Sequence, residues 1–192
     1  MTSRLGALVL SLAACAGRGG PVAADVPAAR EAAAAPLVDR VAMAERVRDE
    51  TRRSWAAYVR DAWGHDELRP VTHTARDWYG APLLITPVDA LDTLVVMGLA
   101  DEANAARTLI DERLSFDQDI TVKNIEITIR VLGGLLSGYQ LTGDAQLLRL
   151  ADDLGARLLP VFGSPTGMPY VYVNLKTGKV SGAKSNPPRS GR

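Results

Sequence analysis

The stretch VKNIEITIRVLGG, from Val122 to Gly134, decides the fold class because its pattern fits either a strand or a helix. Isoleucine and valine alternate with polar residues through it, and β-branched residues at every second position favour a strand. At helical spacing the same segment carries one apolar stripe, formed by Ile125, Ile129, Leu132 and Leu136. No turn signal interrupts the segment before Tyr139, and this length favours a helix.

Glu126 and Arg130 lie four residues apart in this segment, so on a helix their side chains are neighbours on a different face from the apolar stripe. Such a pair is ordinarily a surface ion pair that stabilises a helix by about 0.3–0.5 kcal/mol. A glutamate flanked by isoleucines can also be a catalytic acid, because apolar neighbours raise the pKa of a carboxyl group and a nearby cation lowers it. The residues alone favour the ion pair.

Apolar residues recur at helical spacing in four more segments, which predicts helices at residues 37–62, 88–99, 101–114 and 145–158. The second of these is apolar almost all round, which predicts burial on several sides. Thr86 is expected to cap it, with Asp89 completing a capping box. Gly143 and Asp144 are expected to end one helix and to start the next.

Two regions outside these helices carry turn or strand signals. Pro70 favours the end of the first helix and a loop after it. Beyond Pro160, the segments 170–175 and 179–182 flank the turn KTGK and predict a β-hairpin. The predicted fold is therefore all-α, built of paired helices, with a short β-hairpin near the C-terminus.

The composition is typical of a globular domain and narrows the classes of partner. The 192 residues are 47% hydrophobic and 23% charged, with a formal net charge of zero, so nothing predicts a nucleic-acid partner. One cysteine excludes an intrachain disulfide, and with two histidines it argues against a Cys- or His-rich metal site. Any bound metal is expected to prefer oxygen ligands.

The N-terminus, MTSRLGALVLSLAAC, predicts a signal peptide over residues 1–15, because a basic start precedes an apolar run too short to span a bilayer. Its last four residues, Leu12 to Cys15, resemble the bacterial lipobox, in which the cysteine is acylated. Cys15 is therefore the expected lipid anchor, and the protein is expected in the bacterial periplasm or at the outer membrane. The alternative is a simple secretory signal, with Cys15 removed or without a role. Residues 16–35 predict a disordered tether rich in alanine, glycine and proline.

Four blocks of sequence resemble one enzyme family, the class I α-1,2-mannosidases of glycoside hydrolase family 47. In chain order they are AWGHDELRPVT (62–72), PVDALDTLVVMGL (87–99), EITIRVLGGLLSGYQLTGD (126–144) and RLLPVFGSPTGMPYVYVNLKTG (157–178). The resemblance implies an (α/α)7 barrel of helical hairpins and an inverting enzyme. It also implies removal of terminal α-1,2-linked mannose from oligosaccharides, and a bound calcium ion.

The barrel of this family needs more helices than the five predicted above. The resemblance therefore implies that residues 36–192 are the N-terminal portion of a truncated barrel domain. In the family, the catalytic base and the threonine that holds calcium come from later segments, so no metal ligand is assigned in this chain. A fragment of this kind is expected to be inactive alone and to fold marginally or to associate.

The resemblance places Glu126 on the catalytic acid of the family and Arg130 on the arginine one helical turn beyond it. The family usually has phenylalanine before the acid, where this chain has Ile125, so the shape of the pocket can differ. An inverting glycosidase needs such an acid and a base roughly 6.5–9.5 Å away that activates water. Catalysis by Glu126 then becomes the favoured interpretation.

Five more residues are candidates for substrate binding. His65, Asp66 and Glu67 follow a Trp-Gly break and suit hydrogen bonds to sugar hydroxyls, although a salt-bridged helix end explains them equally well. Asp89 and Asp92 can line the same pocket, although Asp89 also has the capping explanation.

Three functions remain open from the sequence. The first is an exported, lipid-anchored α-1,2-mannosidase, and the second is a surface lipoprotein that binds glycans without hydrolysing them. The third, a ligand-free scaffold of helical hairpins, is disfavoured because the motif blocks do not repeat with a fixed period.

Overall fold

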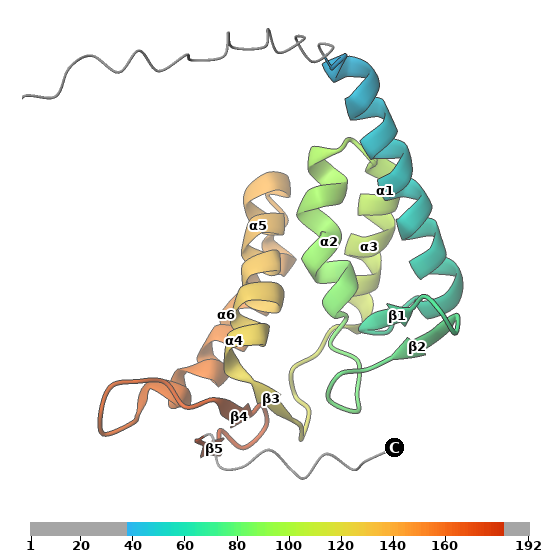
Figure 1. The fold of residues 1–192 in the computed structure, drawn as a ribbon. Helices are drawn as coiled ribbons and strands as arrows, with labels where there is room; N and C mark the ends of the chain where they lie inside the picture. Colours follow the sequence, from blue (N-terminus) through green and yellow to red (C-terminus); the bar gives the residue numbers. More distant parts are fainter. Residues whose placement is uncertain (1–37, 183–192) are drawn as a thin grey trace, which may run out of the picture. The chain divides into compact units, whose positions relative to one another are not determined.

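The computed structural model describes residues 38–182 (Figure 1). The chain divides into two compact units, Met1–Asp39 and Arg40–Arg192, and the fold below is that of the second. The predicted signal peptide, Cys15 and the tether lie outside the described residues. Within residues 38–182, no helix is both long and apolar enough to cross a membrane.

Helices make up most of the described chain. In order, they are α1 (Arg40–Ala62), α2 (Ile85–Val96), α3 (Ala100–Arg113), α4 (Asn124–Ile127), the π-helical η1 (Thr128–Leu132), α5 (Gly133–Thr142), α6 (Ala145–Leu158) and the 3-10 helix η2 (Leu159–Phe162). The four helices predicted from apolar spacing are confirmed to within three residues at each end. The ambiguous segment is also helical, and α4, η1 and α5 follow one another without a break.

Five short strands form two antiparallel sheets. β1 (Glu67–Arg69) and β2 (Thr74–Arg76) pair as a hairpin with Pro70 in its turn, so the loop predicted after the first helix contains two strands that were not predicted. β3 (Thr121–Lys123), β4 (Tyr172–Asn174) and β5 (Val180–Ser181) form a three-stranded sheet with β4 in the middle. The quoted stretch therefore begins as the end of a strand and becomes helical at Asn124.

α2 lies at the centre of the helical packing, beside α3 on one side and α5 on the other, and α6 packs on α5 (Figure 1). Two glycines of α5 allow the close approach to α2. A Cβ atom at Gly134 would lie 2.7 Å from the carbonyl oxygen of Val88, and one at Gly138 would lie 2.8 Å from a methyl group of Leu91. Both Val88 and Leu91 are fully buried, so these contacts belong to the core.

The start of α2 differs from the expected capping box. Leu84 precedes the helix in the left-handed conformation, and α2 has no side-chain cap. Thr86 lies inside the first turn, where its hydroxyl donates to the carbonyl oxygen of Asp66 at 2.6 Å. The predicted cap is therefore wrong. The start of α6 is as expected, since Asp144 accepts a hydrogen bond from the Gln146 amide and Gly143 is left-handed.

The apolar stripe that helical spacing assigns to this segment lies largely on the surface. Ile125 and Ile129 are 57% and 60% exposed, whereas the buried face carries Ile127, Val131 and Leu135. Beyond this stripe, an apolar groove of about 500 Å³ runs between η1, α5, α6 and η2. The groove is lined mainly by Leu132, Leu136, Leu148, Leu159 and Phe162.

Candidate functional site

Glu126 lies in the first turn of α4, directly after β3, and its side chain is 27% exposed. Its carboxylate accepts hydrogen bonds from Arg130 Nε at 3.2 Å and from Lys123 Nζ at 3.5 Å. The hydrogen bond from Arg130 is the largest of the influences that lower the pKa of Glu126 below its ordinary value, and Lys123 adds to it. Burial acts in the opposite direction and raises this pKa by less, and the neighbours Ile125 and Ile129 face solvent.

Arg130 joins carboxylates from two motif blocks. Besides Glu126, its guanidinium binds Asp89 of α2, with 2.8 Å between Nη1 and Oδ2. Arg130 belongs to the π-helical segment η1. π-helical turns are rare in proteins, and those that occur often lie at functional sites. The structure therefore brings together three predicted site residues, Glu126, Arg130 and Asp89.

Glu67 joins this group through an aromatic residue that the sequence analysis missed. The indole N–H of Trp78 donates to Glu67 at 2.6 Å, and the guanidinium carbon of Arg130 lies 5.5 Å from the centre of a Trp78 ring. Arg76 of β2 pairs with the other oxygen of Glu67 at 3.1 Å. Tyr79 also went unpredicted, and the adjacent pair Trp78-Tyr79 in a segment between two motif blocks is the signal that could have found both.

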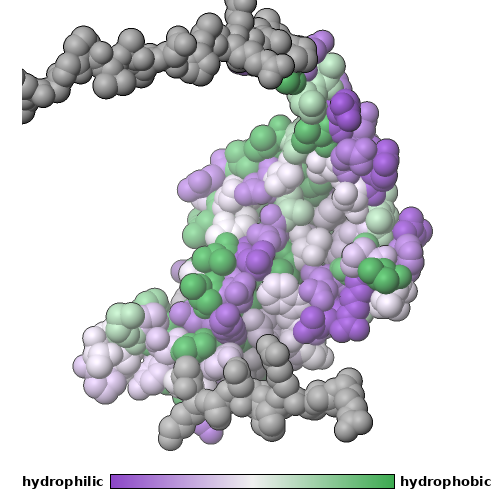
Figure 2. Space-filling view, viewed as in Figure 1, coloured by the Kyte–Doolittle hydropathy of each residue, from purple (hydrophilic) through white to green (hydrophobic). Residues whose placement is uncertain are grey.

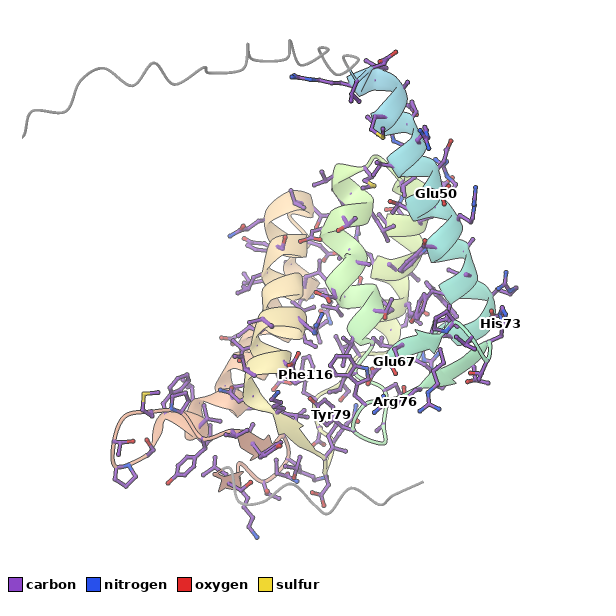
Figure 3. The ribbon with its side chains drawn as sticks, in the orientation of Figure 1. Glu50, Glu67, His73, Arg76, Tyr79 and Phe116 are labelled. Carbon is purple, nitrogen blue, oxygen red and sulfur yellow. The ribbon has the colours of Figure 1, made fainter. Side chains whose placement is uncertain are left out.

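Tyr79 links the hairpin region to the segment that carries Glu126. Its hydroxyl accepts a long hydrogen bond, 3.4 Å, from the backbone N–H of Lys123. Figure 3 labels Tyr79 together with Glu67 and Arg76 of the hairpin. Burial raises the pKa of Tyr79, and the charge of Glu126 adds to the increase. The phenol of Tyr79 is therefore kept neutral, and it is close enough to the Glu126 carboxylate to be affected by its charge.

Asp66 is buried and its carboxylate binds backbone amides, and its role in binding sugar stays a prediction. Its side chain has no exposed surface, and its carboxylate accepts from the backbone amides of Trp78, Leu83 and Ile85. Burial raises the pKa of Asp66, although the three amide donors act in the opposite direction. The carboxylate thereby fixes the segment between the hairpin and α2.

His65 lies apart from the Arg130 group. Its Nδ1 is 3.1 Å from Asp77, and its side chain is exposed. The salt-bridged arrangement considered for this block is therefore present, and a role of His65 in binding sugar stays a prediction.

Asp92 lies one turn beyond Asp89 on α2 and accepts a hydrogen bond from the Ser137 hydroxyl of α5 at 2.9 Å. The two aspartates thus make successive polar contacts from α2 to η1 and α5. In Figure 2 a hydrophilic band runs along this face, with hydrophobic atoms beside it. Such a polar face suits contact with a hydroxyl-rich ligand.

The described residues offer no site that fits a calcium ion. Calcium prefers six to eight oxygen ligands, whereas the carboxylates of Glu126 and Asp89 already face Arg130. Among residues 38–182, no group of three or more His, Cys, Asp or Glu side chains is placed to hold a metal.

Comparison with known proteins identifies the family of the segment that carries Glu126, Arg130 and Asp89. Residues 50–190 match the family model of glycosyl hydrolase family 47. The chain is 46% identical over 136 residues to the human endoplasmic reticulum mannosyl-oligosaccharide 1,2-alpha-mannosidase. The aligned residues are 71% of this chain and 18% of that protein. A mannosyl-oligosaccharide 1,2-alpha-mannosidase of Arabidopsis thaliana is 44% identical over 134 residues, 70% of this chain and 24% of that one.

A solved structure supports the same relationship. The alpha-1,2-mannosidase from Trichoderma reesei matches with a TM-score of 0.69 and 30% identity, over 74% of this chain and 33% of that one. The 192 residues thus span between about a fifth and a third of the length of these relatives. The matched family model covers most of the chain, and the chain belongs to glycosyl hydrolase family 47.

Proposed function

We propose that the chain supplies the general acid of an inverting α-1,2-mannosidase that removes terminal α-1,2-linked mannose from oligosaccharides. The observation that carries the proposal is Arg130, which joins the carboxylates of Glu126 and Asp89 from two separate motif blocks. Glu126 is the proton donor, and Arg130 and Asp89 hold it in place. The relatives reported above are named as α-1,2-mannosidases, and this supports an α-1,2-linked mannoside as the substrate.

In the proposed reaction, Glu126 gives its proton to the glycosidic oxygen as the bond to the anomeric carbon breaks. A base on the other face of the sugar takes a proton from water, and the water oxygen forms the new bond with inverted configuration. Arg130 and Lys123 hold Glu126 in its ionised form in the described chain, so a further acidic group nearby is needed to raise its pKa. That group and the base come, in this proposal, from polypeptide outside the 192 residues.

A calcium ion is also part of the proposed activity. The ion belongs to the activity expected of the family, and its ligands are proposed to lie outside this chain, because residues 38–182 offer no fitting site. Its chemistry is to bind and orient sugar hydroxyls. Calcium chelation is expected to abolish mannose release.

The helical pairs are proposed to be part of an (α/α)7 barrel. The apolar groove along α5, α6 and η2 supports this, because in a closed barrel a further helical pair would cover it. Burial of apolar surface contributes about 25 cal/mol per Å², so covering a few hundred Å² gives several kcal/mol. The isolated 192 residues are proposed to be inactive for lack of the remaining barrel.

Export and lipid anchoring at Cys15 complete the proposal, and the sequence of residues 1–15 supports them. Labelling with a radioactive fatty acid tests the anchor. Loss of the label in a Cys15→Ala variant is expected, and a labelled variant would contradict it.

The reaction is tested on the longest polypeptide that the gene expresses, with α-1,2-mannobiose as substrate. Proton NMR of the first product should show β-mannose, since inversion converts the α-linkage. Release of α-mannose as first product, or unchanged activity with a chelator, would contradict the proposal.

A second function, glycan binding without hydrolysis, is favoured by one observation. Glu126 is paired with two cations, which suits a carboxylate that accepts hydrogen bonds from hydroxyls rather than one that donates a proton. Calorimetry with mannobiose separates the two functions. Binding without any mannose release by the longest expressed form would favour the binding protein.

A further inference from the structure

Both N–H groups of Trp78 are held by consecutive acidic residues. The backbone N–H donates to Asp66 at 3.0 Å, and the indole N–H donates to Glu67 at 2.6 Å. Asp66 is itself fixed by two further backbone amides in the interior. Because the two donors of one residue are bound to a buried anchor and to a strand, the indole ring has a defined orientation.

The face of this ring is turned toward Arg130. The guanidinium carbon lies 5.5 Å from the ring centre, within the range in which an arginine is attracted to an indole face. The other partners of Arg130, Asp89 and Glu126, are both partly exposed. Ion pairs of this exposure hold a long side chain weakly, because water competes with both charges.

Tyr79 contacts Lys123, which precedes Glu126 in the chain as Arg130 follows it. Its hydroxyl accepts from the backbone N–H of Lys123, whose ammonium group contacts Glu126. The rings of Trp78 and Tyr79 also contact each other edge to face, with centres 6.5 Å apart. Two neighbouring residues thus contact the positions on both sides of the proposed acid.

We propose that Trp78, anchored by Asp66 and Glu67, is a positioning residue that holds the Arg130 guanidinium against the carboxylate of Glu126. Trp78 acts through Arg130 and does not itself touch the reacting atoms. The relevance to catalysis rests on the proposed function, whereas the positioning can be measured without turnover. Hairpin β1–β2 thereby becomes part of the site, through Glu67 and its partner Arg76.

Several charged or titratable groups around Glu126 affect its titration. In the described chain they are Lys123 before it, Arg130 after it and the phenol of Tyr79, with Asp89 acting on Arg130. Replacing Trp78 removes none of these four groups, and the proposal expects only Arg130 to change its position. A change in the titration of Glu126 then reports the position of Arg130.

The experiment is a carbon-13 NMR titration of the Glu126 side-chain carboxyl in the 192-residue chain. In Trp78→Leu, which removes the aromatic face, the pKa of Glu126 should shift upward toward its ordinary value. Trp78→Phe keeps an aromatic face and the backbone hydrogen bond to Asp66 but loses the indole N–H bond to Glu67, so it should shift the pKa of Glu126 less than Trp78→Leu does. A wild-type titration in folded Trp78→Leu would overturn the proposal, and so would equal shifts in the two variants.

A second measurement needs no variant. In the unaltered chain, nuclear Overhauser contacts between the indole protons of Trp78 and the δ-methylene of Arg130 are expected, together with an upfield shift of that methylene from the ring. Absence of both would overturn the proposal even if Trp78→Leu does not fold. Full hydrolysis by Glu126→Gln in the longest expressed form would instead refute the proposed function and leave the Trp78 titration result unaffected.

Discussion

Glu126 and Asp66 are two carboxylates of one region with opposite surroundings. Arg130 and Lys123 lower the pKa of Glu126, whereas burial raises the pKa of Asp66. The sequence alone does not separate their surroundings, because these depend on which backbone amides and which cations the fold brings near each carboxylate. Hydrogen-bond donors from residues 78–85 decide the role of Asp66.

Replacement of Asp66 by asparagine should destabilise the chain by about 1–3 kcal/mol, because one buried acceptor is lost and an NH₂ group then faces amide donors. Urea unfolding followed by circular dichroism measures the free energy of unfolding. Asp152→Asn, at an exposed position of α6, is the control and should change stability little. Equal stabilities of the two variants would show that the amide contacts of Asp66 contribute nothing.

The ionisation of Asp61 makes the stability of the fold depend on pH. Hydrogen bonds from Arg60, first, and His73 lower the pKa of Asp61 from 3.8 to about 2. Since the folded pKa lies below the unfolded one, this stabilisation is complete above about pH 4 and is lost as the pH falls toward 2. The stability of Asp61→Asn should therefore fall less between pH 4 and pH 2 than that of wild type in thermal melts, and parallel curves would refute this.

At the element scale, the contact between α2 and α5 depends on glycine. Gly134→Ala would place a Cβ atom 2.7 Å from the carbonyl oxygen of Val88, and the two helices must move apart to accept it. We expect a loss of about 1–3 kcal/mol in the free energy of unfolding. Gly155→Ala in α6 is the matched control, because no atom lies within 4 Å of its added Cβ.

The control should stabilise the chain by about 0.5–1 kcal/mol, since alanine favours a helix over glycine. Chemical denaturation of both variants gives the comparison. A Gly134→Ala chain as stable as Gly155→Ala would show that the helices are not in the close contact described here.

The helices were predictable and the strands β1, β2 and β3 were not, for a physical reason. Apolar spacing over ten or more residues identified α3 and α6, which bury one face along their length, and α1, which buries a face over its C-terminal end. β1, β2 and β3 have three residues each, so they carry no periodicity, and their pairing comes from tertiary contacts. The Thr86 cap failed because the carbonyl oxygen of Asp66, twenty residues away in the chain, takes its hydroxyl.

The candidate site was predictable in part. Glu126, Arg130 and Asp89 came from motif blocks and lie together, whereas Asp66 is internal and His65 pairs with Asp77. Trp78 and Tyr79 were missed because an aromatic residue in a loop has no period that marks it. Their contacts with Arg130 and Lys123 come from the fold, which brings the segment after the hairpin beside these residues.

At the scale of the whole molecule, the apolar surface along α6 and η2 predicts self-association. Leu159 and Phe162 are 66% and 57% exposed and line the same groove. Exposed apolar patches of this kind promote association between chains. Sedimentation velocity of the 192-residue chain should show concentration-dependent oligomers.

The double variant Leu159→Lys with Phe162→Glu should lower the oligomeric fraction several-fold. Val71→Glu replaces an even more exposed valine in the hairpin turn, which does not line the groove, and should leave the oligomeric fraction unchanged. A wild-type chain that stays monomeric and melts in one cooperative transition would contradict the prediction.

The role of Glu126 as proton donor is tested most directly by hydrolysis of α-1,2-mannobiose with Glu126→Gln in the longest polypeptide that the gene expresses. Glu112→Gln, at an exposed position of α3, is the control. Removal of a general acid should reduce kcat by about 10²–10⁴-fold, while the control keeps wild-type activity. Hydrolysis by Glu126→Gln at the wild-type rate would contradict the central claim.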